Sequence, residues 1–199
     1  MIVFVLGLAA TGSYLLCSLI AYLHYPAPFS PLHGDLLGQL GDHNLNPGGA
    51  TVYLIGCALC GTFTLAFFFC LASWRDGGTR TQKRLLILVQ CLGMLGGVGL
   101  VMTGMYPEEF HGIHRFWSNL VFGSFGMALL LSPTVVWRRG HASPDLVTVA
   151  VVSLALYVAS FIDRNAAWIE WSTVALFVVY MWLLGFKTLK GSGRQTSAG

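Results

Sequence analysis

Charged residues are scarce in this sequence. Only 10% of its 199 residues are Asp, Glu, Lys or Arg, whereas 55% are hydrophobic and the mean hydropathy is +0.70. A soluble domain carries about 25% charged residues, because its surface must face water. The shortage of charge therefore excludes an ordinary soluble domain and predicts that most of the protein surface faces lipid.

Several common catalytic and targeting signals are also missing. The sequence contains no glycine-rich phosphate loop, no nucleophile elbow and no H-E-x-x-H motif. The N-terminus lacks the basic segment of a cleavable signal peptide, so we interpret it as the start of a first membrane span. The net charge of +3 does not indicate a nucleic-acid partner, because the basic residues follow a membrane pattern.

The five cysteines all lie inside apolar stretches, where a free thiol behaves as a small hydrophobic side chain. We therefore interpret them as packing residues. A redox pair at Cys57-x-x-Cys60 is the alternative.

Long apolar stretches are the dominant feature of the chain. A bilayer core about 30 Å thick requires roughly 20 apolar helical residues, and six stretches meet or approach that length. They predict an all-α, polytopic bundle in the cell (inner) membrane, with a flexible cytoplasmic tail at 191–199. The six predicted spans are about 2–23, 50–74, 85–105, 116–137, 146–162 and 168–186.

The basic residues are unevenly distributed between the connecting segments. Nine of the eleven fall in segments 75–84, 138–145 and 187–199: Arg75, Arg80, Lys83, Arg84, Arg138, Arg139, Lys187, Lys190 and Arg194. Cytoplasmic segments of membrane proteins are enriched in Lys and Arg. We therefore predict that these segments lie inside, with the N-terminus outside and the C-terminus inside.

The longest connection, residues 24–49, is predicted to form a cap on the outer side. Four leucines at helical spacing predict a short amphipathic helix that Gly41 would end: Leu32, Leu36, Leu37 and Leu40. Because the connection is both long and apolar, we expect it to pack over the mouth of the bundle.

A polar cluster follows the third apolar stretch. Residues 104–115 read Gly-Met-Tyr-Pro-Glu-Glu-Phe-His-Gly-Ile-His-Arg, so two carboxylates, two imidazoles and a guanidinium lie within eight residues. The first connection contains an echo, since residues 25–33 and 106–114 both read Y-P-x-x-F-x-x-(L/I)-H. We predict a structurally related pair, with chance similarity as the alternative.

These side chains support the hypothesis of a metal-assisted site. Zinc accepts imidazole and carboxylate ligands, and a metal-bound water can act as a nucleophile. The candidate ligands for zinc or another divalent metal are His33, His43, His111 and His114. The candidate catalytic residues are Glu108, His111, His114 and Asp42, with Glu108 or Asp42 as proton acceptor. An interfacial cluster of hydrogen-bonded polar side chains is the alternative.

A second group of residues is predicted to contact a substrate. Guanidinium groups suit phosphate geometry, so the two arginines expected on the outer side are candidates for an anionic head group. The predicted contacts are Arg115, Arg164, Asn46 and Tyr106.

The motifs in the two outer connections resemble those of the domain of unknown function 998 family. Tyr25-Pro26, Ser30, Leu40-Gly41 and Asn44 or Asn46 match its first outer loop, and Gly104, Tyr106-Pro107, Glu108 and His111 or His114 match the segment after its third span. Gln39 stands where an acid is usual, with Asp35 and Asp42 on either side. The chain is more faintly similar to the Frag, DRAM and Sfk-type six-span proteins, some of which are linked to lipid remodelling. The first resemblance implies a membrane fold and location but no activity.

The leading functional hypothesis is an integral membrane protein with an outward-facing polar site that performs metal-assisted hydrolysis or transfer on a lipid. The alternative is a non-enzymatic lipid-binding scaffold or small carrier that uses the same cavity. Membrane lipids are the expected partners, and a homo-oligomer is left open.

Overall fold

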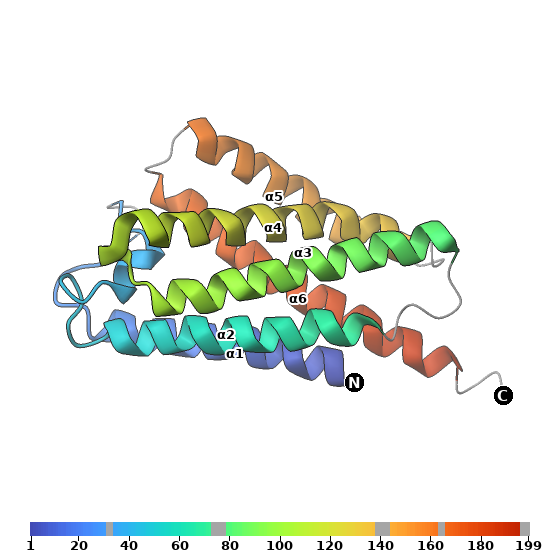
Figure 1. Ribbon diagram of the computed structural model, residues 1–199, viewed down its shortest axis with the longest axis horizontal. Helices are drawn as coiled ribbons and strands as arrows, with labels where there is room; N and C mark the ends of the chain where they lie inside the picture. The colour runs from blue at the N-terminus through green and yellow to red at the C-terminus, as the bar shows by residue number, and fades with distance from the viewer. Residues whose placement is uncertain (31–33, 73–78, 138–143, 163–165, 196–199) are drawn as a thin grey trace.

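The chain folds as a bundle of helices that lie roughly alongside one another (Figure 1). The computed structural model describes residues 1–30, 34–72, 79–137, 144–162 and 166–195. The α-helices are α1 (Ile2–Leu23), α2 (Ala50–Cys70), α3 (Arg80–Met105), α4 (His111–Trp137), α5 (Pro144–Ile162) and α6 (Ala167–Gln195). Two short 3-10 helices, η2 (Leu37–Gly41) and η4 (Glu108–Phe110), lie in the connections.

The predicted all-α membrane bundle is confirmed. Five helices are long and apolar enough to cross a membrane, and α5 contributes a shorter apolar stretch, Pro144–Ala159. Helix ends differ from the predicted spans wherever polar residues continue the helix. Thr79 and Gln82 form a capping box, with bonds of 2.8 and 3.3 Å, that starts α3 at Arg80 instead of 85. Likewise α4 begins at His111, and α6 continues to Gln195.

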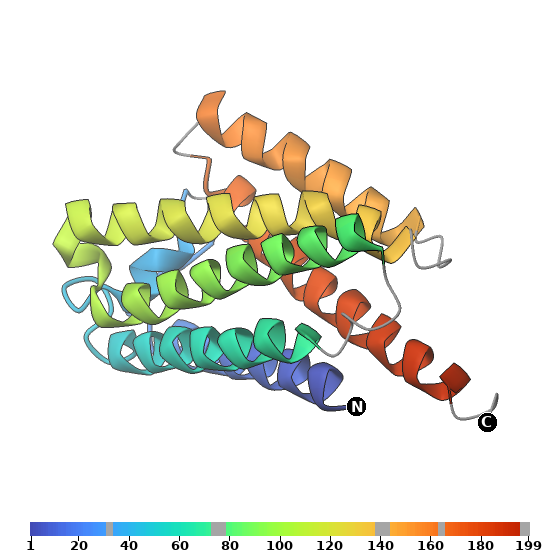
Figure 2. The same cartoon turned by 45° about the vertical axis from the view of Figure 1, so that its right-hand side comes forward.

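Helix α3 lies between α2 and α4, and glycines allow the close approach on both sides (Figure 2). A Cβ atom on Gly61 of α2 would lie 2.6 Å from the Gly97 carbonyl oxygen of α3. On the α4 side, a Cβ on Gly96 would lie 2.4 Å from the Phe125 ring. The α2–α3 contact is therefore a backbone-to-backbone contact of the kind that small residues permit in membranes.

The beginning of α1 and the end of α6 lie at the same end of the bundle (Figure 1). In agreement, a Cβ on Gly185 would lie 3.2 Å from the Phe4 Cα atom. Six helices return the chain to the side on which it started, so the two termini cannot lie on opposite sides of a membrane. A basic tail on the inner side therefore requires the N-terminus to lie on the inner side as well. The predicted placement of the N-terminus outside is wrong for this arrangement.

The connection between α1 and α2 covers the opposite end of the bundle, but its helix is shorter than predicted. Leu37 and Leu40 are buried in η2, whereas Leu32 lies outside the described residues. Gly34 has a φ of +88°, a left-handed conformation that cannot continue a right-handed helix. Two of the four predicted leucines are therefore buried and Leu36 is half-buried, and the helix is limited to η2, with the extended residue Leu36 before it.

Two side chains, one buried and one half-buried, fasten this cap to the helices. Asn46 is fully buried and donates to the carbonyls of Ala21 (3.1 Å) and Leu40 (2.9 Å), while its own oxygen accepts from the Gly49 amide (3.1 Å). On the other side, the indole N–H of Trp171 on α6 donates to the Asp35 carbonyl at 3.0 Å. The cap is thus bonded to α1 and α6.

The two Y-P-x-x-F stretches share only their aromatic pair. Tyr25 contacts Phe29 with ring centroids 4.7 Å apart, and Tyr106 contacts Phe110 at 6.2 Å. Phe29 is buried and followed by irregular chain, whereas Phe110 is exposed and followed at once by α4. The predicted structural pair is not seen beyond the phenylalanine, and His33 lies outside the described residues.

Candidate functional site

A narrow cavity of about 100 Å³ runs through the interior of the bundle. The end of the cavity under the cap, called its outer end, is formed by Gly38 of η2, His114 of α4 and Glu170 of α6, and the wall along α4 reaches Leu129. Fifteen residues separate His114 from Leu129, which corresponds to about 22 Å of helix. Most of the wall is apolar, so the cavity is an elongated apolar pocket, called the channel below, with a polar outer end.

Glu170 is the acidic side chain that lines that outer end. It lies in the first turn of α6, and its carboxylate accepts hydrogen bonds from the backbone amides of Leu37 and Gly38 at the start of η2. Next to it, the hydroxyls of Tyr14 and Tyr53 are hydrogen-bonded at 3.1 Å, and both tyrosines line the cavity. Glu170 therefore joins the cap to the polar end of the cavity.

Sequence reasoning missed Glu170 as a site residue, although a signal was present. An ionisable side chain inside an apolar helix is a functional candidate by default. Glu170 lies within the predicted sixth span, but the site prediction relied on the denser polar cluster at 104–115.

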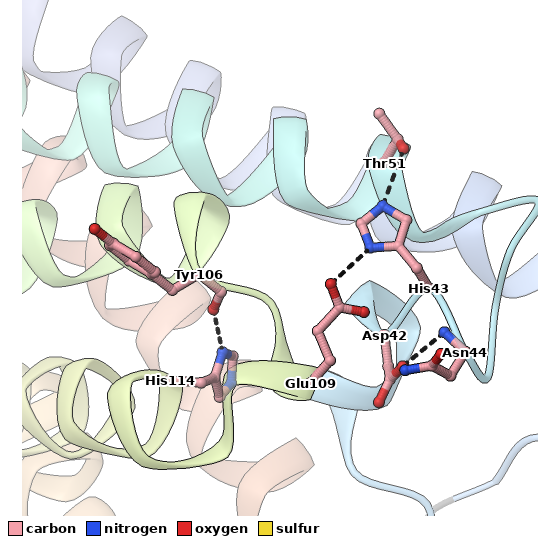
Figure 3. A network of polar contacts seen from close by, with 7 residues as sticks. All are labelled: Asp42, His43, Asn44, Thr51, Tyr106, Glu109 and His114. Atoms are coloured by element: carbon pink, nitrogen blue, oxygen red, sulfur yellow. Dashed lines mark hydrogen bonds and ion pairs between the residues drawn. The ribbon is translucent and has the colours of Figure 1, made fainter.

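His114 is the predicted site residue that reaches the cavity. Its Nδ1 atom lies 2.8 Å from the Tyr106 carbonyl oxygen, which accepts the ring N–H (Figure 3). The other ring nitrogen, Nε2, then carries a lone pair and lies 3.3 Å from the position that a Cβ on Gly38 would occupy. Glu108 Oε2 lies 2.9 Å from the same position. Glycine at position 38 thus lets the cap pack directly against these two side chains.

The outer end is electrostatically acidic. Burial raises the pKa of the Tyr25 hydroxyl in the cap, and the carboxylates of Asp35, Asp42 and Glu108 raise it further. The pKa of a phenol responds to three carboxylates only when all three lie near its hydroxyl group. Acidic side chains of the cap and η4 therefore gather around Tyr25, with His111 and Arg115 acting on Glu108 from the start of α4.

Two predicted metal ligands lie outside the cavity. His43 is exposed, with its Nδ1 3.6 Å from the Glu109 carboxylate and its Nε2 3.4 Å from the Thr51 hydroxyl (Figure 3). His111 is exposed at the start of α4. His114, in contrast, points under η2, so the three described histidines diverge.

The described residues contain no group of three or more His, Cys, Asp or Glu side chains that could hold a metal ion. His33, the fourth predicted ligand, lies outside them. The predicted metal set is therefore not assembled by the part of the chain that the structure describes, because His111 stays exposed at the start of α4 while His114 is held by the Tyr106 carbonyl against Gly38.

The other predicted residues shape the cap or lie on the surface. Asp42 is buried and its Oδ1 accepts the Asn44 amide at 2.8 Å, so it forms a local turn (Figure 3). Asn46 is occupied by the backbone bonds described above, and Tyr106 contributes its carbonyl to His114. Arg115 is exposed, and Arg164 lies outside the described residues.

Cys57 and Cys60 are free, buried and line the cavity beside Tyr53. Their position on the wall is consistent with the interpretation as small hydrophobic side chains.

Comparison with known proteins gives a family but no characterised relative. No curated protein and no solved structure matches the chain. One family model, described as "Protein of unknown function (DUF998)", matches residues 8–187. The match covers the cap, η4 and most of the six-helix bundle, and so includes every residue at the outer end of the cavity. The chain therefore belongs to the DUF998 family, as the motifs in its two outer connections predict.

Proposed function

We propose that this protein binds a single-chain amphiphile from the surrounding membrane and acts as a lipid-binding protein or small carrier. The observation that supports the proposal is the cavity with its apolar wall and its polar outer end under the cap. An amphiphile placed with its chain in the channel and its head beside Glu170 and His114 would match both parts.

The dimensions favour a slender ligand. A length of about 22 Å along α4 covers much of a hydrocarbon core about 30 Å thick. The volume of about 100 Å³ is below that of ordinary drug-sized pockets, about 300–1,000 Å³. One alkyl chain suits this shape better than a two-chain phospholipid.

An occupant would also stabilise the bundle. Empty core space costs about 24 cal/mol per Å³, so a cavity of this size costs about 2 kcal/mol when it is empty. Filling it with a methylene chain recovers the lost packing contacts. Binding should therefore raise the thermal stability of the protein.

The test uses two glycines that differ only in where a side chain would project. A Cβ on Gly126 or on Gly12 would have no atom within 4 Å, but Gly126 lines the cavity and Gly12 lies on the exposed side of α1. We expect the native protein and Gly12→Leu to retain one dodecyl amphiphile in native mass spectrometry, and Gly126→Leu to lose it. Equal retention by all three proteins would disprove binding in the cavity.

One observation favours a second candidate, hydrolysis or acyl transfer on a lipid. With Nδ1 donating to Tyr106, His114 presents its basic Nε2 atom beside the cavity, the form that a general base requires. The test is release of p-nitrophenol from its dodecanoate ester, with zinc and with chelator. Turnover that is lost in both His114→Gln and Gly126→Leu would favour the enzyme, whereas turnover unchanged in these variants would count against it.

A further inference from the structure

The free polar groups at the outer end of the cavity are hydrogen-bond acceptors. With its Nδ1 proton donated to Tyr106, a neutral His114 offers only a lone pair at Nε2. Glu108 Oε2, which packs against Gly38 close to His114 just behind the cavity wall, is a buried atom with no hydrogen-bond partner among the described residues. An ionised carboxylate accepts and does not donate. An occupant of this space must therefore supply the donors.

The charge of the outer end also favours a ligand with a donor head group. Glu170 and Glu108 interact electrostatically, and the described residues that line the cavity include no Lys or Arg. Arg115 is exposed on α4, where it and His111 interact electrostatically with Glu108 and not with Glu170. A phosphate or carboxylate head would meet like charge in a low-dielectric environment, which is strongly unfavourable. This arrangement argues against the anionic head group that the arginines suggested in the sequence.

An independent observation indicates that the cavity is built to be filled. Ser153 of α5 lines its deeper part, is only 7% exposed, and has a hydroxyl with no partner among the described residues. Helical serines and threonines normally donate to a carbonyl one turn earlier, as Ser132 and Thr173 do at 2.5 and 2.7 Å. A buried, unpaired hydroxyl is unfavourable, so a partner inside the cavity is expected.

From these observations we propose that the ligand is a long-chain primary amine, a single alkyl chain with an ammonium head. The proposal rests on the function proposed above and names the chemical class of its ligand. An ammonium group carries three donors and one positive charge, and so complements His114 Nε2 and the carboxylates of Glu170 and Glu108. The alkyl chain then extends toward Leu129, and water held beside it can satisfy Ser153.

The experiment compares head groups on one chain length. Radiolabelled dodecylamine, dodecanol and dodecanoate are equilibrated at pH 7 with the protein in neutral phosphatidylcholine nanodiscs. Binding to Gly126→Leu, in which the channel is filled, is subtracted as membrane partitioning. We expect dodecylamine to bind at least about tenfold more tightly than dodecanoate, because each charge-assisted hydrogen bond contributes that much or more.

Matched variants assign the preference to the site. Glu170→Gln should remove most of the tenfold preference, whereas Glu109→Gln, which changes a neighbouring carboxylate paired with His43 outside the cavity, should keep it. Thermal unfolding of each variant shows whether it is folded, and the comparison on the native protein does not depend on either variant. If dodecanoate binds as tightly as dodecylamine, the amine proposal is wrong while cavity binding stands. If none of the three probes exceeds Gly126→Leu, the proposed function itself fails.

Discussion

At the scale of single residues, Asn46 does more for the cap than any charged group around it. Its side chain satisfies the Ala21 and Leu40 carbonyls and the Gly49 amide in a place that is fully buried. In such a place water cannot replace a missing partner. A substrate contact, as predicted from the sequence, would require side-chain atoms that these three bonds already occupy.

We expect Asn46→Ala to lower the free energy of unfolding by on the order of 2 kcal/mol or more, since it leaves buried backbone groups unsatisfied. Thermal unfolding of the purified protein measures the change. Asn44→Ala is the control, because Asn44 is an exposed asparagine in the same connection. Equal effects of the two substitutions would show that the buried bonds of Asn46 contribute little.

Sequence patterns located the polar end of the protein but not its arrangement. The spacing of Glu108, His111 and His114 correctly indicates a polar cluster where α4 begins. It cannot tell that the helix starts at His111 itself, where one imidazole is exposed and the other is half-buried against η2. Glu170 escaped notice because its partners, the Leu37 and Gly38 amides, are more than 130 residues away and are backbone atoms.

At the scale of elements, the contact between α2 and α3 depends on the absence of side chains. A Cβ on Gly61 would lie 2.6 Å from the Gly97 carbonyl oxygen and 2.7 Å from the Val101 amide nitrogen. Backbone atoms in the middle of a helix cannot move singly, so the two helices would have to separate. The abundance of glycine in the third apolar stretch predicts such close packing, but only the structure shows which glycines face which neighbour.

We therefore expect Gly61→Ala to destabilise the bundle by about 1–3 kcal/mol, the usual range for overpacking. Gly12→Ala is the same substitution at a position with no atom within 4 Å of the new Cβ. It should be neutral, or stabilise the protein by up to about 1 kcal/mol, because alanine has a higher helix propensity than glycine. Thermal unfolding of the two variants side by side measures the difference. A Gly61→Ala protein as stable as Gly12→Ala would mean that the α2–α3 contact is looser than the structure indicates.

At the scale of the whole molecule, the two ends of the bundle differ in chemistry. One end carries the cap and η4 (Figure 1). The polar end of the cavity, with His114 and Glu170, lies under this cap. The other carries the start of α1, the start of α3 and the end of α6, where Lys187 forms an ion pair of 2.9 Å with Asp145. Hydropathy correctly predicted the number of helices. The side on which the chain begins depends on whether the number of membrane crossings is even or odd, and the count of basic residues did not take this into account.

The arrangement of the ends makes a topology prediction. Nine of the eleven basic residues favour the cytoplasmic side for segments 75–84, 138–145 and 187–199, and the structure puts the N-terminus at that same end. In a variant without native cysteines, Ala27→Cys in the cap should react with a membrane-impermeant maleimide added to intact cells. Arg80→Cys at the start of α3, and an epitope placed before Met1, should become accessible only after the membrane is permeabilised. Labelling of the N-terminal epitope in intact cells would contradict this topology. It would also contradict an outward-facing cavity mouth, because one helix separates the N-terminus from the cap and so places them on opposite sides of the membrane.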